Sequence, residues 1–221
     1  MTNLPTSVLH MSGILRLPQT SLPIQNWTLY TSQRRAILGR SGAGKSTILR
    51  LMAGLDDDYS SFEGHLENNA ERTALLSQEP ALIEAYDLLG NLCLGARLRH
   101  EKPDMDFAAH CLDRLGLQGL ERRRPSHLSG GQRQRVALAR LLFEGADLWL
   151  LDEPFSGLDM VTKQEVINYV HELGAHVSMV MVTHDPREAK ALSMSCSILS
   201  KAEFVEAQEH GDEDDMIRLM Q

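Results

Sequence analysis

The stretch that decides the fold is a glycine-rich loop that reads Gly39-Arg40-Ser41-Gly42-Ala43-Gly44-Lys45-Ser46-Thr47. It fits the pattern G-x-x-x-x-G-K-[ST], in which backbone N–H groups cradle the phosphates of a nucleotide. Its glycines permit backbone angles that turn successive N–H groups inward. In this pattern Lys45 would reach the β- and γ-phosphates, and the Ser46 hydroxyl would bind Mg²⁺.

The sequence on either side of the loop has the form that the pattern requires. Residues 35–38, Arg-Ala-Ile-Leu, are a short run suited to a buried strand, and residues 46–55 predict a helix. The buried face of that helix would hold Ile48, Leu51, Met52 and Leu55. A helix N-terminus bears partial positive charge, which favours a bound phosphate at this position.

Length and composition limit the class of protein. The 221 residues, 43% of them hydrophobic and 24% charged, fit one large domain or a domain with a subdomain. A net charge of -8 argues against a nucleic-acid partner. The basic segment 121–124 is interpreted as a solvated turn, with a phosphate- or partner-binding patch as the alternative.

Cysteine usage and hydropathy indicate the compartment. The three cysteines are widely spaced and lack metal-ligand spacing, which is typical of reduced thiols in a cytosolic protein. The N-terminus does not resemble a signal peptide, and no apolar run reaches the ~18 residues that span a bilayer. We therefore expect any membrane process to involve a separate partner.

Strand-like and helical segments alternate along the chain, which predicts an α/β fold with a largely parallel sheet. The predicted strands cover residues 7–17, 24–30, 35–38, 73–76, 148–153, 177–182 and 197–199. A helical block is expected at 82–119, followed by helices that begin near 129, 163 and 186. We also expect a polar turn at Asp56–Asp58 and a short amphipathic helix at Met216–Met220.

Polar side chains follow three of the predicted strands. Asp152 and Glu153 come directly after a hydrophobic strand, and His184 follows another. Ligands of open parallel sheets collect beyond the carboxyl ends of the strands. Asp152 therefore fits a Mg²⁺ ligand, Glu153 a general base for an attacking water, and His184 a contact to the γ-phosphate. The alternative for each is an ordinary solvated strand exit.

The motifs together resemble those of the ATP-binding cassette (ABC) ATPases, the motor subunits of ABC transporters. Residues 128–135, Leu-Ser-Gly-Gly-Gln-Arg-Gln-Arg, match the family signature. Residues 39–47 match its Walker A motif and residues 148–153 its Walker B motif. Gln78 matches the Q-loop, residues 156–159 the D-loop, and His184 the switch histidine. The motifs occur in family order and span most of the chain.

The resemblance implies a single P-loop NTPase domain over residues 1–221. It would have a mostly parallel core sheet, N-terminal antiparallel strands and a helical subdomain at about 82–135. The cofactors would be ATP and Mg²⁺, with Ser46, Gln78 and Asp152 at the metal. Glu153, His184 and Gln78 would be the catalytic residues.

Family members form head-to-tail dimers around two ATP molecules, so the resemblance also implies contacts across a dimer. The nucleotide bound to one Walker A would be contacted by the partner's signature and D-loop, here Ser129, Gly130, Gly131, Gln132 and Asp159. The close approach of two glycines and the N-terminus of the following helix suit a γ-phosphate. A homodimer is the simplest expectation, with a heterodimer of two ABC ATPases as the alternative.

The resemblance further implies a membrane partner. In transporters of this family the Q-loop and helical subdomain receive a cytoplasmic helix of an integral permease, so the chain would be peripheral on the inner face of the cell membrane. Residues 78–95 would line the groove, where Leu82, Ile83, Leu88 and Leu92 could face the permease or form core. The compact domain resembles small uptake-type ATPases, such as those for thiamine and related solutes.

Two other function classes remain open. One is a soluble ABC ATPase of the iron–sulfur-assembly type, and the other is a non-catalytic nucleotide-binding regulator, which the presence of Glu153 and His184 disfavours. The family also has an aromatic residue that stacks on adenine, upstream of the Walker lysine. Here Arg16, Leu17 and Pro18 occupy that window. Arg16 could stack through its guanidinium, and GTP remains an alternative substrate.

Overall fold

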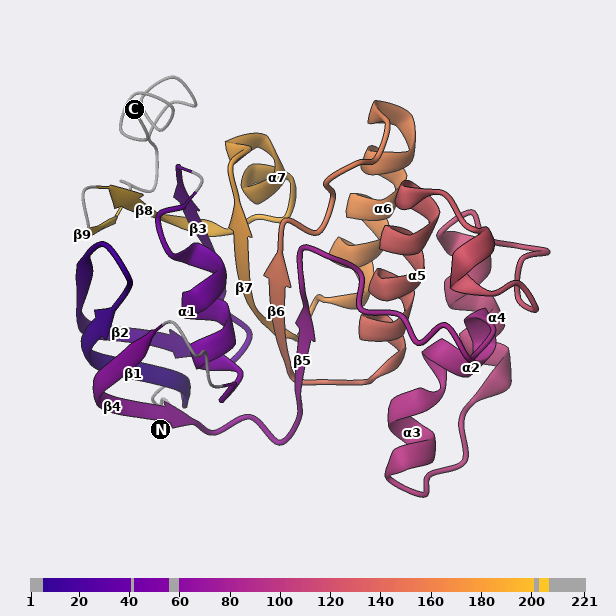
Figure 1. Ribbon diagram of the computed structural model, residues 1–221, viewed down its shortest axis with the longest axis horizontal. Helices are drawn as coiled ribbons and strands as arrows, with labels where there is room; N and C mark the ends of the chain where they lie inside the picture. Colours follow the sequence, from indigo (N-terminus) through magenta and orange to yellow (C-terminus); the bar gives the residue numbers. More distant parts are fainter. Residues whose placement is uncertain (1–5, 41, 56–59, 201–202, 207–221) are drawn as a thin grey trace, which may run out of the picture.

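The computed structural model describes residues 6–40, 42–55, 60–200 and 203–206, which form two β-sheets and the helices packed around them (Figure 1). Three sequence predictions lie outside these ranges. They are the position of Ser41 in the glycine-rich loop, the polar turn at Asp56–Asp58, and the helix at Met216–Met220.

The larger sheet has the strand order β5-β6-β7-β3-β8-β9. All neighbouring strands pair in parallel except β8 and β9, which are antiparallel. The predicted parallel α/β fold is confirmed. The strands are β3 (Arg34–Gly39), β5 (Thr73–Leu76), β6 (Leu148–Asp152), β7 (Ser178–Thr183), β8 (Ser195–Ser200) and β9 (Glu203–Glu206).

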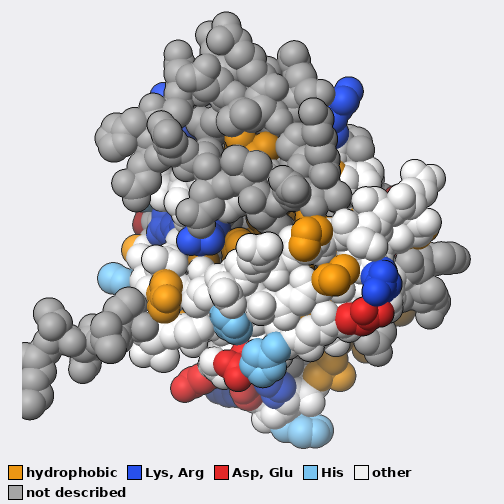
Figure 2. All heavy atoms as spheres, turned by 90° about the vertical axis from the view of Figure 1, so that its left-hand side faces the viewer, with side chains coloured by type: hydrophobic (Ala, Val, Ile, Leu, Met, Phe, Trp, Pro, Cys, Tyr) orange, Lys and Arg blue, Asp and Glu red, His pale blue; other side chains and the backbone are white. Residues whose placement is uncertain are grey.

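The smaller sheet is antiparallel and has the order β2-β1-β4. It consists of β1 (Ser7–Arg16), β2 (Ser21–Tyr30) and β4 (Ser61–Asn68). The first two strands were predicted, whereas β4 and β9 were not. Figure 2 shows the side of the molecule on which this sheet lies, where histidine and charged side chains gather beside scattered hydrophobic ones.

Helix α1 (Lys45–Met52) lies between the two sheets. It buries Ile48, Leu49 and Met52 in a core shared with β1, β2 and one face of the larger sheet. The predicted extension of this helix to residue 55 is wrong. Because the helix ends at Met52, Leu55 is 49% exposed, and Leu49 occupies the buried position instead.

The opposite face of the larger sheet is covered by helices α5 (Gly130–Phe143), α6 (Met160–Leu173) and α7 (Pro186–Ala191). Alternation along β6 divides the two cores. Leu148 and Leu150 pack on the side of α1, and Trp149 and Leu151 pack on the side of α5 and α6. Every residue of β6 and β7 is buried, as is typical of parallel strands covered on both faces.

The helical block between β5 and β6 contains α2 (Leu88–Leu92), α3 (Leu94–Leu98), α4 (Met105–Arg114) and the 3₁₀ turn η1 (Pro125–His127). The helical region predicted through residues 88–98 is present, but it is divided at Cys93 into two five-residue helices, and Leu98 is 71% exposed. No helix among the described residues is long and apolar enough to cross a membrane.

Candidate active site

The loops that follow β3, β6 and β7 meet at one edge of the larger sheet, because these three strands are neighbours that run in the same direction. The glycine-rich loop follows β3. Asp152 ends β6 and Glu153 follows it, and His184 follows Thr183 at the end of β7. The structure therefore brings together the polar strand ends that the sequence singled out.

The glycine-rich loop leads directly into α1. Gly44 is the N-cap of the helix and has φ +91°, a left-handed conformation that favours glycine. A Cβ atom at this position would also lie 2.5 Å from the Cδ1 atom of Leu17. A side chain at residue 44 would thus be strained and would collide with the turn that follows β1.

The Lys45 side chain is folded against its own loop. Only 7% of this residue is exposed, and its Nζ donates hydrogen bonds to the carbonyl oxygens of Gly39 (2.8 Å) and Arg40 (2.9 Å). Burial lowers the pKa of Lys45, and the charges of Glu153 and Asp152 partly oppose this effect. The carbonyl groups of its own loop therefore hold the ammonium group close enough to be affected by the charges of both carboxylates.

Asp152 has one oxygen without a protein partner. The residue is 6% exposed, and its Oδ1 is buried and accepts no hydrogen bond. Burial raises the pKa of this carboxyl, while hydrogen bonding from Ser46, the charge of Lys45 and the backbone of Gln78 oppose the rise. A buried carboxylate oxygen without a protein partner is suited to bind a hard cation.

The donor set around Asp152 fits Mg²⁺ held jointly with nucleotide phosphates. It combines one carboxylate with the Ser46 hydroxyl, which hydrogen-bonds to it. The described residues contain no cluster of three or more His, Cys, Asp or Glu side chains that could hold a metal alone. Mg²⁺ is commonly bound by one or two carboxylates, phosphate oxygens and water, so these residues fit the ion.

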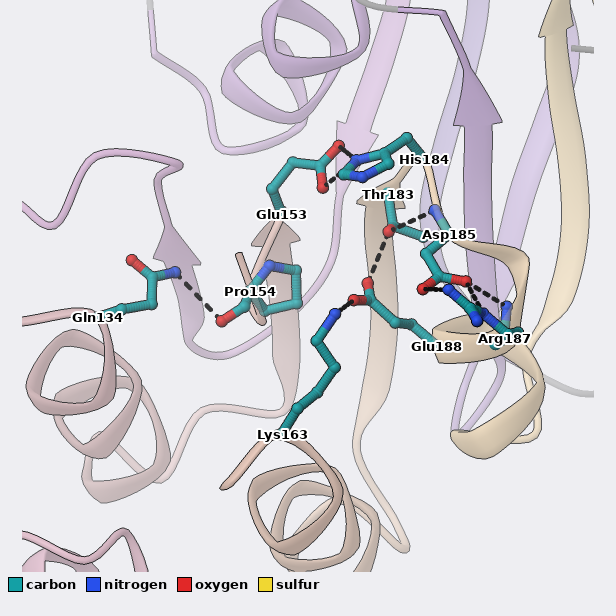
Figure 3. Close-up of polar contacts among 9 residues, drawn as sticks. All are labelled: Gln134, Glu153, Pro154, Lys163, Thr183, His184, Asp185, Arg187 and Glu188. Carbon is teal, nitrogen blue, oxygen red and sulfur yellow. Dashed lines mark hydrogen bonds and ion pairs between the residues drawn. The ribbon is translucent and has the colours of Figure 1, made fainter. Parts of the chain in front are cut away.

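Glu153 and His184 form a pair just beyond the ends of β6 and β7 (Figure 3). The Nδ1 atom of His184 lies 2.9 and 2.8 Å from the two carboxylate oxygens of Glu153. The Glu153 side chain is 13% exposed and the His184 side chain 70%. Glu153 has φ +47°, and its N–H donates to the Val182 carbonyl (2.9 Å), which fixes the turn after β6.

A cavity of about 730 Å³ lies in front of the glycine-rich loop. Its size suits a small-molecule ligand. It is lined by residues 17–20, by the described loop residues Gly42 and Gly44 with Lys45, Ser46 and Thr47 of α1, and by Gln78, Asp152, Glu153 and Val182. The cavity therefore collects most of the residues expected at the phosphates and the metal.

The turn between β1 and β2 forms the far wall of this cavity, and its residues Gln19 and Thr20 were not singled out from the sequence. Arg16, the expected stacking group, instead makes two hydrogen bonds to Glu63 on β4 (2.7 and 2.9 Å). Trp27, an aromatic residue upstream of the Walker lysine, is buried under the guanidinium of Arg35 and does not line the cavity. The residues of this turn that line the cavity, Leu17 to Thr20, include no aromatic side chain.

The signature residues belong to the start of α5 and do not line this cavity. Ser129 is the N-cap and forms a capping box with Gln132. The Ser129 hydroxyl accepts from the Gln132 N–H (3.3 Å), and the Gln132 side chain accepts from the Ser129 N–H (2.9 Å). Ser129 and Gly130 are exposed. The tip of α5 is thus preorganised and open to solvent.

One hydrogen bond and one close backbone approach relate α5 to the loop after β6. The buried Gln134 donates a hydrogen bond to the Pro154 carbonyl (3.1 Å, Figure 3), and a Cβ at Gly131 would lie 3.1 Å from the Gly157 carbonyl. Asp159 caps α6 by accepting from the N–H groups of Val161 and Thr162. Hydrogen bonding from the Thr162 side chain, followed by that from the backbone, lowers the pKa of Asp159. Asp159 also does not line the cavity.

Comparisons with known proteins agree with this arrangement. Residues 23–156 match the family model described as ABC transporter. An uncharacterized ABC transporter ATP-binding protein of Haemophilus influenzae is 38% identical over 187 residues, which cover 84% of this chain and 78% of that protein. The aliphatic sulfonates import ATP-binding protein SsuB 2 of Mesorhizobium japonicum is also 38% identical, over 83% of this chain and 73% of its own length.

A more distant match is the sulfate/thiosulfate import ATP-binding protein CysA of Xanthomonas campestris, 37% identical over 75% of this chain and 53% of its own length. Among solved structures, a metal-chelate type ABC transporter in an inward-facing conformation is similar with a TM-score of 0.77 and 27% identity, over 92% of this chain and 84% of that chain. On this evidence the chain belongs to the ABC transporter family, among its ATP-binding proteins.

Proposed function

We propose that this chain is the ATP-hydrolysing subunit of an ABC importer, which pairs with a second cassette around two ATP molecules and powers a separate membrane permease. The observation that carries the proposal is the joint placement of Lys45, Asp152 and Glu153 on one cavity next to the glycine-rich loop. The import direction is proposed from relatives whose names describe import ATP-binding proteins.

In this proposal each residue has a distinct task at the phosphates. The loop N–H groups and the α1 N-terminus would bind the β- and γ-phosphates together with Lys45. Ser46, Gln78 and Asp152 would hold Mg²⁺, which neutralises phosphate charge. Glu153 would accept a proton from the attacking water. His184, now paired with Glu153, would contact the γ-phosphate.

A second cassette is needed because the signature residues lie outside the cavity of their own chain. The tip of α5 exposes Ser129 and Gly130 but has no phosphate to contact within the monomer. We infer that it contacts the nucleotide of a partner cassette, together with Asp159. ATP would hold the two cassettes together, and hydrolysis would let them separate.

The permease would dock beside the helical block. Leu82, Leu88 and Leu92 are buried, so these three form core, whereas Ile83 is 42% exposed. Tyr86 is exposed near it, and its N–H donates to the Ile83 carbonyl. A separate hollow of about 280 Å³, lined in part by the exposed Leu98, lies between β5, α3 and α5. These exposed apolar groups could receive a helix of the permease.

Replacement of Glu153 by Gln tests the hydrolytic mechanism. The variant should lose ATP turnover by about 100-fold or more, since a general base contributes 10²–10⁴, but should retain an ATP-dependent dimer on gel filtration. Lys45→Ala is the matched control, and it should lose both turnover and dimer because phosphate binding fails. Unchanged turnover in Glu153→Gln would refute the assignment of the base.

Affinity purification from detergent-solubilised membranes tests the link to transport. We expect an integral protein with several ~20-residue apolar spans to co-purify with the chain. Ile83→Glu should weaken that association, whereas Ile14→Glu, at an exposed apolar position on the far sheet, should not. Co-purification with soluble iron–sulfur-assembly components instead would favour the alternative function.

A further inference from the structure

Glu188 is a buried carboxylate that the proposed mechanism leaves without a task. It lies in α7 and is 5% exposed, and both of its carboxylate oxygens have partners (Figure 3). Oε1 accepts from the Lys163 ammonium at 2.7 Å, and Oε2 accepts from the Thr183 hydroxyl at 2.6 Å. A buried carboxylate is retained at a cost unless such partners satisfy it.

The Thr183 hydroxyl connects this carboxylate to the loop of His184. Thr183 is fully buried at the end of β7, and its hydroxyl also accepts a hydrogen bond from the N–H of Asp185 (3.1 Å). The residues on both sides of His184 are therefore fixed by one hydroxyl. Because the Thr183 hydroxyl donates its hydrogen bond to Glu188, the lone pairs of that oxygen remain free to accept from the Asp185 N–H.

Lys163 brings a second part of the site into the same network. It lies in the first turn of α6, where its N–H donates to the carbonyl of Asp159 (2.8 Å). Its side chain is 28% exposed and reaches across to Glu188 on α7. A continuous chain of contacts thus runs from Asp159 through Lys163, Glu188 and Thr183 to His184.

We propose that Glu188 is a positioning residue that sets the loop of His184 through the Thr183 hydroxyl and couples that loop to the first turn of α6 through Lys163. The inference rests on the proposed function, because it assigns His184 a role in hydrolysis. His184 has a largely exposed side chain and touches Glu153 through its ring. The orientation of the His184 ring therefore depends on how firmly the backbone of its loop is held.

A double-mutant cycle on turnover tests this proposal. Glu188→Gln should lower kcat by about 10- to 100-fold, the cost of misplacing a catalytic group, while KM for ATP stays within about threefold. In a His184→Ala background the same substitution should cause little further loss, because Glu188 acts through His184. An equal further loss in that background would overturn the proposal.

Matched variants separate positioning from stability. Thr183→Val removes the hydroxyl but leaves the ion pair of Lys163 and Glu188, and it should show the same loss of kcat. It serves as the test should Glu188→Gln fold poorly. Tyr169→Phe removes another buried hydroxyl, which contacts Cys111, and should leave kcat unchanged. Glu172→Gln breaks the ion pair with Arg114 and should also leave kcat unchanged. Lys163→Arg should keep activity, and Lys163→Met should reduce it.

A measurement without turnover separates this inference from the proposed function. The His184 ring signals of labelled protein, identified by their loss in His184→Ala, should shift or broaden in Glu188→Gln and Thr183→Val but not in Glu172→Gln. A wild-type chain that hydrolyses no ATP would refute the proposed function, and these spectra would still decide whether Glu188 sets His184. Unchanged His184 signals in both variants would overturn the inference.

Discussion

The buried oxygen of Asp152 that has no protein partner carries an energetic cost. The carboxyl group is buried, and burial raises its pKa despite the nearby Lys45. The folded chain therefore holds the proton of Asp152 at pH values where the unfolded chain has released it. Stability should fall as the pH rises from the ordinary value of 3.8 through the raised pKa in the folded state.

Replacement of Asp152 by Asn should accordingly stabilise the free protein while it abolishes Mg²⁺-dependent turnover. At pH 7 without nucleotide, the midpoint of thermal unfolding should rise by about 2–4 °C, and the difference should shrink as the pH approaches 3.8. Asp113→Asn, at an exposed position on α4, should change nothing. A lower midpoint for Asp152→Asn at every pH would contradict this account.

Individual site residues differed in how far they could be predicted. The sequence singled out Lys45, Asp152 and His184, because each follows a strand or lies in a loop of recognisable spacing. Glu188 and Lys163 were not singled out, because their partnership depends on how α6 packs against α7, and neither residue belongs to a motif. The sequence also did not indicate that Arg16, the expected stacking group, pairs with Glu63, because Glu63 lies on β4, a strand that was not predicted.

At the scale of the elements, α5 is the helix that presents the signature. Its N-terminus is capped by Ser129 and carries two glycines, and it faces solvent rather than the cavity of its own chain. In the proposed function, this exposed N-terminus would contact the nucleotide of a second cassette. The hydrogen bond from Gln134 to the Pro154 carbonyl ties the helix to the loop after β6, and the backbone at Gly131 approaches that loop so closely that a Cβ there would lie 3.1 Å from the Gly157 carbonyl oxygen.

Ser129→Arg should therefore block pairing without blocking nucleotide binding. In a Glu153→Gln background, ATP should no longer produce a dimer on gel filtration, whereas ATP affinity of the monomer should stay within about threefold because Ser129 lies outside the cavity. The lost cap should reduce stability by about 1 kcal/mol. Ser61→Arg, the same change on β4, is the control, and persistence of the dimer in Ser129→Arg would count against pairing through α5.

The elements that were predicted have strong hydrophobic patterns. The strands at 73–76 and 148–152 and the buried face of α5 are apolar on the side that packs. The missed strand β4 has a mostly exposed pattern in which Phe62 and Leu66 are half-buried, and it pairs with β1 alone. Its backbone partners, rather than its own side chains, hold it in the sheet, so its sequence gave little signal.

At the scale of the whole molecule, the cavity lies between parts that are distant in sequence. Residues 17–20 come from the β1–β2 turn, and Asp152 and Glu153 follow β6. A nucleotide bound there would link the antiparallel sheet to the larger one. Binding to the folded chain should therefore raise its unfolding free energy.

Thermal unfolding with nucleotides tests this linkage and the selectivity for the base. In Glu153→Gln, ATP with Mg²⁺ at 100 times its Kd should stabilise the chain by about 2.7 kcal/mol. GTP should bind within about tenfold of ATP, since Leu17 and Pro18 offer apolar contact rather than base-specific hydrogen bonds. Lys45→Ala should show no shift with either. Discrimination of more than about 100-fold would indicate that another group reads the base.

The backbone of Glu153 has a consequence for how such a cassette could change over generations. Its left-handed φ of +47° suits asparagine or glycine better than glutamate, by about 1 kcal/mol. Loss of the glutamate to either residue would relax the turn, so selection for robustness alone would erode it. The position therefore combines a less favourable backbone with the carboxylate that the proposed function assigns to water activation, and a variant with asparagine there should be sturdier but inert.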